Sequence, residues 1–265
     1  MAKRKSAKDS VAIADVPDAP LRWLVLTYAP VSLFSLRSTY SMSKGGKTLL
    51  VPTPYSVKMA LIDAVFRYAP VDQAEIAACT MFDRLKANRI RFHPPNECVV
   101  QNTFVKIRQE ERGGDAGQYV PTIAYRELVF FSGQLSIAIG VRSYAEEEVA
   151  AIVEAAMHIN YFGKRGSFFQ FIASEVLDEL PEGYSISQDD LSPTMTIGLY
   201  GVTQYLDDFG PELCKAKDGF ERISTFHGGK IEHGKHRVLV STLLPYHRVE
   251  ATRSFTRYST PAQTN

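Results

Sequence analysis

Two prolines and a run of apolar residues at helical spacing make residues 50–68 the stretch that most constrains the fold. Pro52 and Pro54 disfavour helix in the residue before each, and Thr53 suits the N-cap of a helix that begins at Pro54. Apolar side chains then recur at the i, i+3, i+4 and i+7 spacing of an amphipathic helix, at Val57, Ala60, Leu61, Ala64, Val65 and Tyr68. An extended segment must therefore turn sharply into a core helix here.

The loop before this helix is cationic and rich in glycine. Its candidate binding residues are Arg37, Tyr40, Lys44, Gly45, Gly46 and Lys47. Glycines let the backbone approach a partner closely and adopt positive φ, and the N-terminus of a helix favours anions. The loop and helix start therefore suit phosphate, although an ordinary surface loop before a core helix explains the same residues.

Alternating strand and helix patterns continue along the chain. A strand is expected at 21–28, helices at 72–87 and 145–158, and further strands at 89–93, 99–108, 125–131, 133–141 and from 167. The segment 109–118 is polar and contains three glycines, so residues 99–131 are predicted to form a long hairpin.

The order strand, helix, strand, hairpin, strand, helix, strand predicts an α+β fold. It indicates a ferredoxin-like (RNA-recognition-motif-like) domain over residues 21–178, with an inserted β-hairpin thumb at about 99–131. Residues 1–20 are expected to form a flexible tail, and residues 179–265 a smaller β-rich C-terminal lobe.

Overall charge does not indicate the partner. Thirty Lys and Arg residues balance 29 Asp and Glu, so the net charge is only +1 and nucleic-acid binding can be argued only from local clusters. Cys79, Cys98 and Cys214 are widely spaced without a CxxC pair, which indicates a reducing compartment. No apolar run approaches transmembrane length, and the expectation is a cytoplasmic protein without a membrane partner.

Cations alternate with aromatic residues in two further segments. Lys106 and Arg108 follow Phe104, and Lys164 and Arg165 follow Tyr161. Cations neutralise phosphates while aromatic rings stack on bases, so this mixture is typical of single-stranded RNA binding.

Signatures of catalysis are sparse. The six histidines form no HxxxH or HExxH pattern, and no Walker A loop, GxSxG or Rossmann glycine motif is present. The segment 227–236 is rich in His, Gly and Lys and could hold a metal or phosphate, but a mobile hairpin turn is the simpler explanation. We therefore predict no catalytic residue, no metal site and no cofactor.

In their order along the chain, these features resemble the Cas-five family of the RAMP superfamily, which caps the 5′ handle of the guide RNA in type I CRISPR Cascade complexes. The resemblance covers residues 21 to about 175, while the C-terminal lobe matches only in being β-rich. It is carried by the Lys44–Lys47 loop, Val51–Leu61, Gln101–Lys106, the hairpin and Tyr161–Ser167.

The resemblance implies a thumb hairpin that packs over guide RNA, contacts with a large subunit and a backbone subunit, and an indirect contact with target DNA. On this basis Arg37, Lys44, Lys47 and Lys58 are expected to contact phosphate, together with the backbone of Gly45 and Gly46. Tyr40 would stack on a handle nucleotide. Lys164 and Arg165 would form a secondary site, and Lys106 and Arg108 would contribute from the hairpin.

Two alternatives remain open at this point. One branch of the family is a metal-independent endoribonuclease, but its Tyr/Lys/His arrangement has no match here. A ribonuclease could instead use Tyr40, His93 or the His233–His236 region as acid and base. The third possibility is a ferredoxin-like structural protein that binds no RNA.

Overall fold

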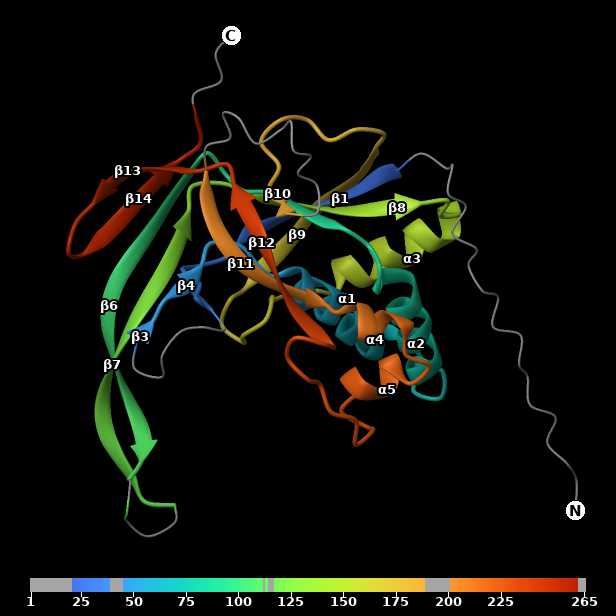
Figure 1. Ribbon diagram of the computed structural model, residues 1–265, viewed down its shortest axis with the longest axis horizontal. Helices are drawn as coiled ribbons and strands as arrows, with labels where there is room; N and C mark the ends of the chain where they lie inside the picture. The colour runs from blue at the N-terminus through green and yellow to red at the C-terminus, as the bar shows by residue number, and fades with distance from the viewer. Residues whose placement is uncertain (1–20, 39–44, 112, 114–116, 189–200, 262–265) are drawn as a thin grey trace, which may run out of the picture.

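A four-stranded antiparallel sheet carries the core in this computed structural model, which describes residues 21–38, 45–111, 113, 117–188 and 201–261 (Figure 1). The strands are β1 (Leu21–Pro30), β5 (Ile90–His93), β8 (Leu135–Arg142) and β9 (Phe169–Leu177), in the order β5-β8-β1-β9. β1 pairs antiparallel with β8 and β9, and β8 pairs antiparallel with β5. The apolar first strand is therefore internal to the sheet, as its composition predicts.

Three helices follow the periodicity of the sequence closely. They are α1 (Pro54–Tyr68), α2 (Ala74–Leu85) and α3 (Glu146–Met157). The buried side chains of α1 include Val57, Leu61 and Val65, which lie on the predicted apolar face. The prediction of an α+β chain is thus confirmed.

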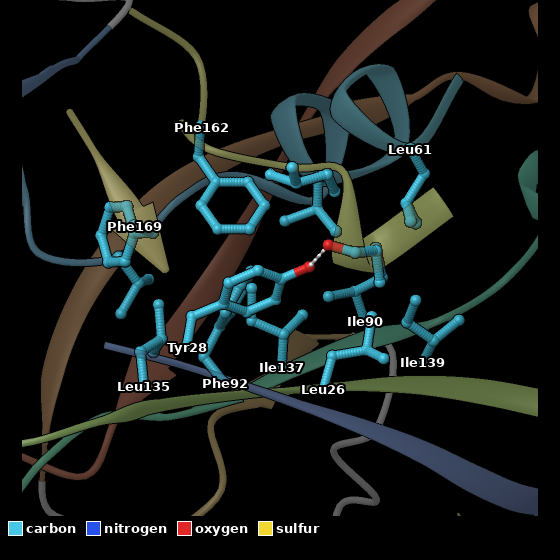
Figure 2. Packing of buried hydrophobic residues seen from close by; sticks show 14 of the residues in the cluster. Leu26, Tyr28, Leu61, Ile90, Phe92, Leu135, Ile137, Ile139, Phe162 and Phe169 are labelled. Atoms are coloured by element: carbon cyan, nitrogen blue, oxygen red, sulfur yellow. Dashed lines mark hydrogen bonds between the residues drawn. The ribbon is translucent and has the colours of Figure 1, made fainter. Parts of the chain in front are cut away.

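A buried tyrosine links the sheet to the helices. Tyr28 is fully buried, and its hydroxyl donates a hydrogen bond of 2.9 Å to the backbone oxygen of Ala156 at the end of α3 (Figure 2). Phe162 and Phe171 pack edge-on against the tyrosine ring, with centroids 5.0 and 5.6 Å away. Burial raises the pKa of the Tyr28 phenol, so the group stays protonated and the hydrogen bond satisfies it.

The predicted hairpin is present and is the most extended part of the fold. β6 (Glu97–Glu110) pairs antiparallel with β7 (Tyr119–Phe131), from Cys98↔Phe131 to Glu110↔Tyr119. Neighbouring strands β13 (His247–Ala251), β14 (Phe255–Ser259) and β3 (Gly45–Gly46) extend its base into a five-stranded sheet of order β13-β14-β6-β7-β3. Beyond Phe104 and Tyr125 the described hairpin consists of β6 and β7 alone, and this part projects from the body (Figure 1).

The C-terminal residues divide between two sheets. β10 (Ile186–Ser187), β11 (Val202–Phe209) and β12 (Arg237–Leu244) form a three-stranded sheet of order β10-β12-β11. In contrast, β14 (Phe255–Ser259) pairs with β6, and β13 (His247–Ala251) pairs with β14. Only part of the β-rich lobe expected at 179–265 therefore forms a sheet of its own.

The remaining elements are short. They are β2 (Leu36–Arg37), β3 (Gly45–Gly46), β4 (Thr48–Leu49), α4 (Pro211–Lys215) and α5 (Gly219–Ile223). β2 pairs with β4 just before α1. Among the described residues, no helix is long and apolar enough to span a membrane.

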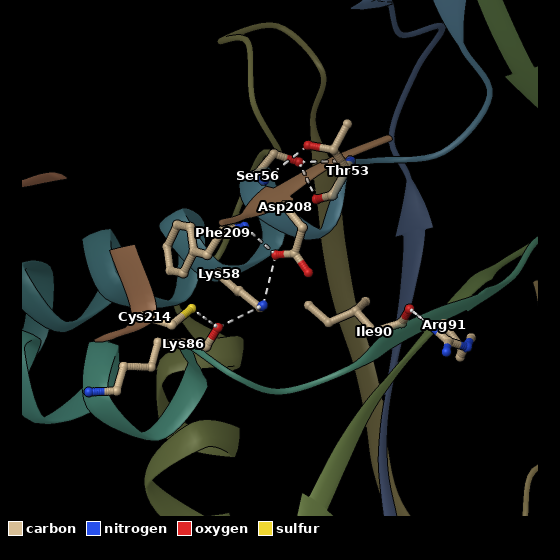
Figure 3. A network of polar contacts seen from close by, with 9 residues as sticks. All are labelled: Thr53, Ser56, Lys58, Lys86, Ile90, Arg91, Asp208, Phe209 and Cys214. Carbon is tan, nitrogen blue, oxygen red and sulfur yellow. Dashed lines mark hydrogen bonds and ion pairs between the residues drawn. The ribbon is translucent and has the colours of Figure 1, made fainter. Parts of the chain in front are cut away.

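A buried ion pair joins α1 to β11. The Lys58 side chain is 1% exposed, and its Nζ atom lies 2.7 Å from Oδ1 of Asp208 and 3.3 Å from the backbone oxygen of Lys86 (Figure 3). The backbone N–H of Phe209 donates to the same Asp208 oxygen at 2.7 Å. Because three elements converge on these two side chains, the pair determines how β11 lies against α1.

Replacing Lys58 by Met should lower the free energy of unfolding by about 3 kcal/mol, because it leaves the partly buried Asp208 carboxylate without its cation. The double change Lys58→Met and Asp208→Asn should recover most of the loss. Lys86→Met is a matched control, since the Lys86–Asp83 pair has the same 2.7 Å distance at a more exposed position. That control should cost less than about 1 kcal/mol in urea denaturation. Equal losses for Lys58→Met and Lys86→Met would contradict this role.

Candidate nucleic-acid interface

The N-terminus of α1 is capped by hydrogen bonds from its own residues. Thr53 Oγ1 accepts from the backbone N–H of Ser56 at 3.1 Å, and Ser56 Oγ accepts from the backbone N–H of Thr53 at 3.0 Å. The backbone N–H of Val57 donates to the Thr53 oxygen. The predicted N-cap is confirmed, but the amides of Ser56 and Val57 are already bonded. The helix start is therefore a weaker phosphate site than the sequence indicates.

The Gly45-Gly46 pair contacts the hairpin. These residues form β3, which pairs parallel with Tyr125 and Arg126 of β7. A Cβ atom on Gly46 would lie 2.9 Å from both the Tyr125 backbone oxygen and the Arg126 Cδ atom. Gly46 is thus required by a close approach within the protein, which differs from the predicted approach to a ligand.

Two predicted cations lie at the base of the hairpin. The Lys47 side chain is 78% exposed, with its Nζ atom 3.7 Å from Oε1 of Glu127. Glu127 is buried and accepts a hydrogen bond of 2.9 Å from the backbone N–H of Thr48. Arg37 is exposed and pairs in register with Thr48. The backbone segments that carry Arg37 and Lys47 are therefore neighbours, while Tyr40 and Lys44 lie outside the described residues.

The turn after α3 lies against the same region. Ser167 Oγ donates to the Ser35 backbone oxygen at 3.3 Å, and Gly163 lies beside the Leu36 side chain. Gly163 and Gly166 adopt φ of 64° and 101°, which allows a tight turn. Lys164 and Arg165 are exposed on this turn, next to the strand that carries Arg37. The fold thus brings together two cationic segments that are far apart in sequence.

One face of the projecting hairpin carries both cations and apolar side chains. Phe104, Lys106 and Arg108 alternate on β6, and their register partners Tyr125, Ile123 and Pro121 share that face. Phe104 is 72% exposed and Ile123 is 66% exposed. The Phe104 and Tyr125 rings lie edge to face, with centroids 5.7 Å apart. We call these six residues the hairpin strip.

The sequence alone misses half of this strip. Tyr125, Ile123 and Pro121 are not adjacent in sequence to any cation of β6, and only the hairpin register places them beside Phe104, Lys106 and Arg108. Period-2 alternation within β7 is the signal that could have identified them, once the hairpin turn was located.

The structure contradicts the prediction that Lys58 contacts phosphate. Its side chain points into the protein, where it is 1% exposed and paired with Asp208. A lysine on an amphipathic helix is usually exposed, and the carboxylate that makes burial tolerable lies 150 residues away in the sequence.

The histidines considered for acid–base catalysis are separated. His93 is half-buried beside Tyr184, and burial lowers the pKa of its imidazole. His236 is buried, and its Nδ1 atom accepts a hydrogen bond of 3.1 Å from the backbone N–H of Glu232. Within the described part of the chain, no group of three or more His, Cys, Asp or Glu residues is placed to hold a metal ion.

Comparison with known proteins supports the resemblance seen in the sequence. No protein-family model matches the chain. A protein of Archaeoglobus fulgidus named CRISPR-associated protein Cas5 is 21% identical over 212 residues, which cover 78% of this chain and 86% of that protein. The predicted resemblance is thus confirmed: the chain is similar to a Cas5 protein over most of its length.

Two solved structures are more distant. One is a crystal structure of a CRISPR protein from Archaeoglobus fulgidus, with a sequence identity of 10% and a TM-score of 0.44. The alignment covers 91% of this chain and 92% of that chain. A cryo-EM structure of the type III-B Cmr-beta complex bound to cognate target RNA contains a chain that is 12% identical. The alignment with that chain covers 60% of this chain and 61% of that chain, and the TM-score is again 0.44. At these scores neither structure establishes a shared fold.

Adding a methyl group at Gly46 should separate β3 from the hairpin. Gly46→Ala is expected to lower the free energy of unfolding by about 1–3 kcal/mol, because the Tyr125 backbone oxygen cannot move aside without disturbing β7. Gly228→Ala is the control, since a Cβ there meets no atom within 4 Å. Equal urea midpoints for the two variants would show that β3 does not require glycine at position 46.

Proposed function

We propose that this chain is a non-catalytic RNA-binding subunit of a CRISPR effector complex, and that it holds the 5′ end of the guide RNA. The observation that supports this proposal is the hairpin strip. Its side chains offer cations for phosphates and exposed apolar and aromatic surfaces for bases, on a hairpin that projects from the body. Single-stranded nucleic acid is bound by this combination of charge and stacking.

The sheet order agrees with a ferredoxin-like frame. Counted along the chain, β1, β5, β8 and β9 are the first to fourth strands of the sheet, so the order β9-β1-β8-β5 runs fourth, first, third, second. Helices follow the first and third of these strands. This is the arrangement of a split βαβ fold, which RNA-recognition modules share. The fold alone is an analogy, and the function rests on the strip.

A path for the RNA follows from the cations. Phosphates would meet Lys106 and Arg108 on the hairpin and Arg37 and Lys47 at its base. Lys164 and Arg165 would extend the path along the neighbouring turn, since Ser167 of that turn bonds to Ser35. Tyr40 and Lys44 belong to the same loop by sequence and remain part of the proposal.

The more specific assignment rests on the resemblance and on the Cas5 relative. It makes the complex a type I Cascade, the RNA segment the 5′ handle, and the protein partners a large subunit and a backbone subunit. Target DNA would then be reached through the guide RNA. The expected location is the cytoplasm, where such a complex would act in antiviral defence.

Removing two cations from the hairpin strip should lower the affinity for RNA and make that affinity less dependent on salt concentration. For single strands the slope of log K against log salt is about −0.7 per neutralised phosphate, so Lys106→Ala with Arg108→Ala should reduce its magnitude by about 1.4. The measurement is a filter-binding titration with a labelled single-stranded RNA. The double variant Lys215→Ala and Lys217→Ala removes two exposed cations elsewhere and should leave the slope unchanged. The same slope in wild type and the hairpin variant would remove the strip from the RNA site.

RNA that is incubated with the purified protein should remain uncleaved, with or without divalent metal. General acid–base cleavage needs an exposed base near the attacking 2′-hydroxyl and an acid near the leaving oxygen. His93 is half-buried, His236 is buried, and the exposed His233 lies between α5 and β12, so none of the three lies on the hairpin. Site-specific cleavage of a repeat-derived RNA, lost in Tyr40→Phe or His93→Ala, would favour the endoribonuclease alternative.

A further inference from the structure

A pocket of about 320 Å³ lies along the outer side of α1. Tyr55, Met59, Asp63 and Arg67 line it at intervals of four residues, which places them on one face of the helix. Tyr161, from the turn after α3, and Arg237, from the start of β12, complete the lining. The pocket therefore combines residues from three parts of the chain that the sequence does not associate.

Both arginines of the pocket are held in place. Arg67 Nη1 donates to the His158 backbone oxygen and to Asn160 Oδ1, each at 3.1 Å, and its guanidinium also pairs with Asp63. Arg237 pairs with the buried Asp207 carboxylate. Fixed guanidinium groups lose little conformational entropy when a ligand binds.

Each arginine also lies against a tyrosine. The Arg237 guanidinium is 4.2 Å from the centroid of the Tyr55 ring, and the Arg67 guanidinium is 5.5 Å from that of Tyr161. The lining thus contains two arginine–tyrosine stacks, with Met59 as an apolar contact. Such side chains suit a planar, aromatic ligand, and an unstacked nucleobase is one.

Asp63 determines which base fits. Its carboxylate is 53% exposed and accepts hydrogen bonds only, and the Arg67 guanidinium pairs with its Oδ2 atom. Guanine is the RNA base whose Watson–Crick edge presents two adjacent donors, N1–H and the N2 amino group. We propose that the pocket binds one unstacked guanine of the bound RNA, with the Asp63 carboxylate accepting from N1–H and N2–H.

The surroundings of the pocket fit this ligand. Tyr161 and Gly163 line the pocket, and Lys164 and Arg165 follow them on the same exposed turn. Phosphates on either side of the guanine would therefore lie near cations. The inference rests on the proposed RNA-binding function and adds base identity to it.

The test uses the full chain and fluorescein-labelled RNA octamers. U8 measures the contribution of the backbone, and octamers with one central guanosine, inosine or adenosine measure that of the base. Inosine lacks only the 2-amino group, so it removes one donor. We expect the guanosine octamer to bind about tenfold more tightly than U8, with most of this gain lost for inosine and adenosine.

Variants of the pocket residues test whether the tighter binding of the guanosine octamer depends on the pocket. Asp63→Asn should abolish the preference for guanosine, measured as the ratio of the affinities for the guanosine octamer and U8. Asp83→Asn is the matched control, because the Asp83 side chain has the same exposed fraction of 53% and also pairs with a cation, Lys86. Tyr161→Phe should keep the gain, and Tyr161→Leu should reduce it. Equal binding of the guanosine and inosine octamers, or a guanosine preference that persists in Asp63→Asn, would overturn the proposal.

A second measurement separates this inference from the proposed function. Calorimetric titration with 5′-GMP and 5′-IMP does not depend on the hairpin strip or on RNA length. We expect 5′-GMP to bind about tenfold more tightly than 5′-IMP, and only when Asp63 is present. If U8 fails to bind but 5′-GMP shows this preference, the proposed function fails and the pocket stands. If U8 binds and the two nucleotides do not differ, the pocket assignment fails alone.

Discussion

The ion pair between Lys58 of α1 and Asp208 of β11 joins two distant parts of the chain. Lys58 and Asp208 are 150 residues apart, yet their side chains form a contact of 2.7 Å inside the protein. A charge at that depth is tolerated only if its partner is in place. The same contact joins α1 to β11, which pairs with β12, and Arg237 of β12 lines the pocket along α1.

Periodicity predicted the individual elements well. The apolar first strand, the helix after Pro54 and the long hairpin all follow from patterns among neighbouring residues of the chain, and each is present. The burial of Lys58 could not be predicted in this way, because its partner is distant in sequence. Gly46 shows the same difficulty: the sequence shows that a glycine is needed, but not that the neighbour is Tyr125 of the hairpin.

In the candidate site, too, local patterns predict some residues, while others depend on contacts between distant segments. Lys106 and Arg108 were identified from composition, since alternation with Phe104 is visible locally. Ile123 and Tyr125 required the hairpin register, and the pocket between α1, Tyr161 and Arg237 required the tertiary fold. The resemblance to the Cas-five family supplied the order of the motifs and an expected function. It did not indicate which cations already pair with carboxylates of the protein itself.

The pairing of β14 with β6 has a consequence for synthesis. β6 is complete early, but the strand that covers its edge begins only at Phe255, which pairs with Gln101. Until then the nascent hairpin exposes unpaired backbone groups beside half-buried apolar residues such as Val99. Contacts between such distant segments form slowly, and open edges are sites of aggregation. The long hairpin is thus vulnerable during translation, in the interval before the last strands emerge from the ribosome.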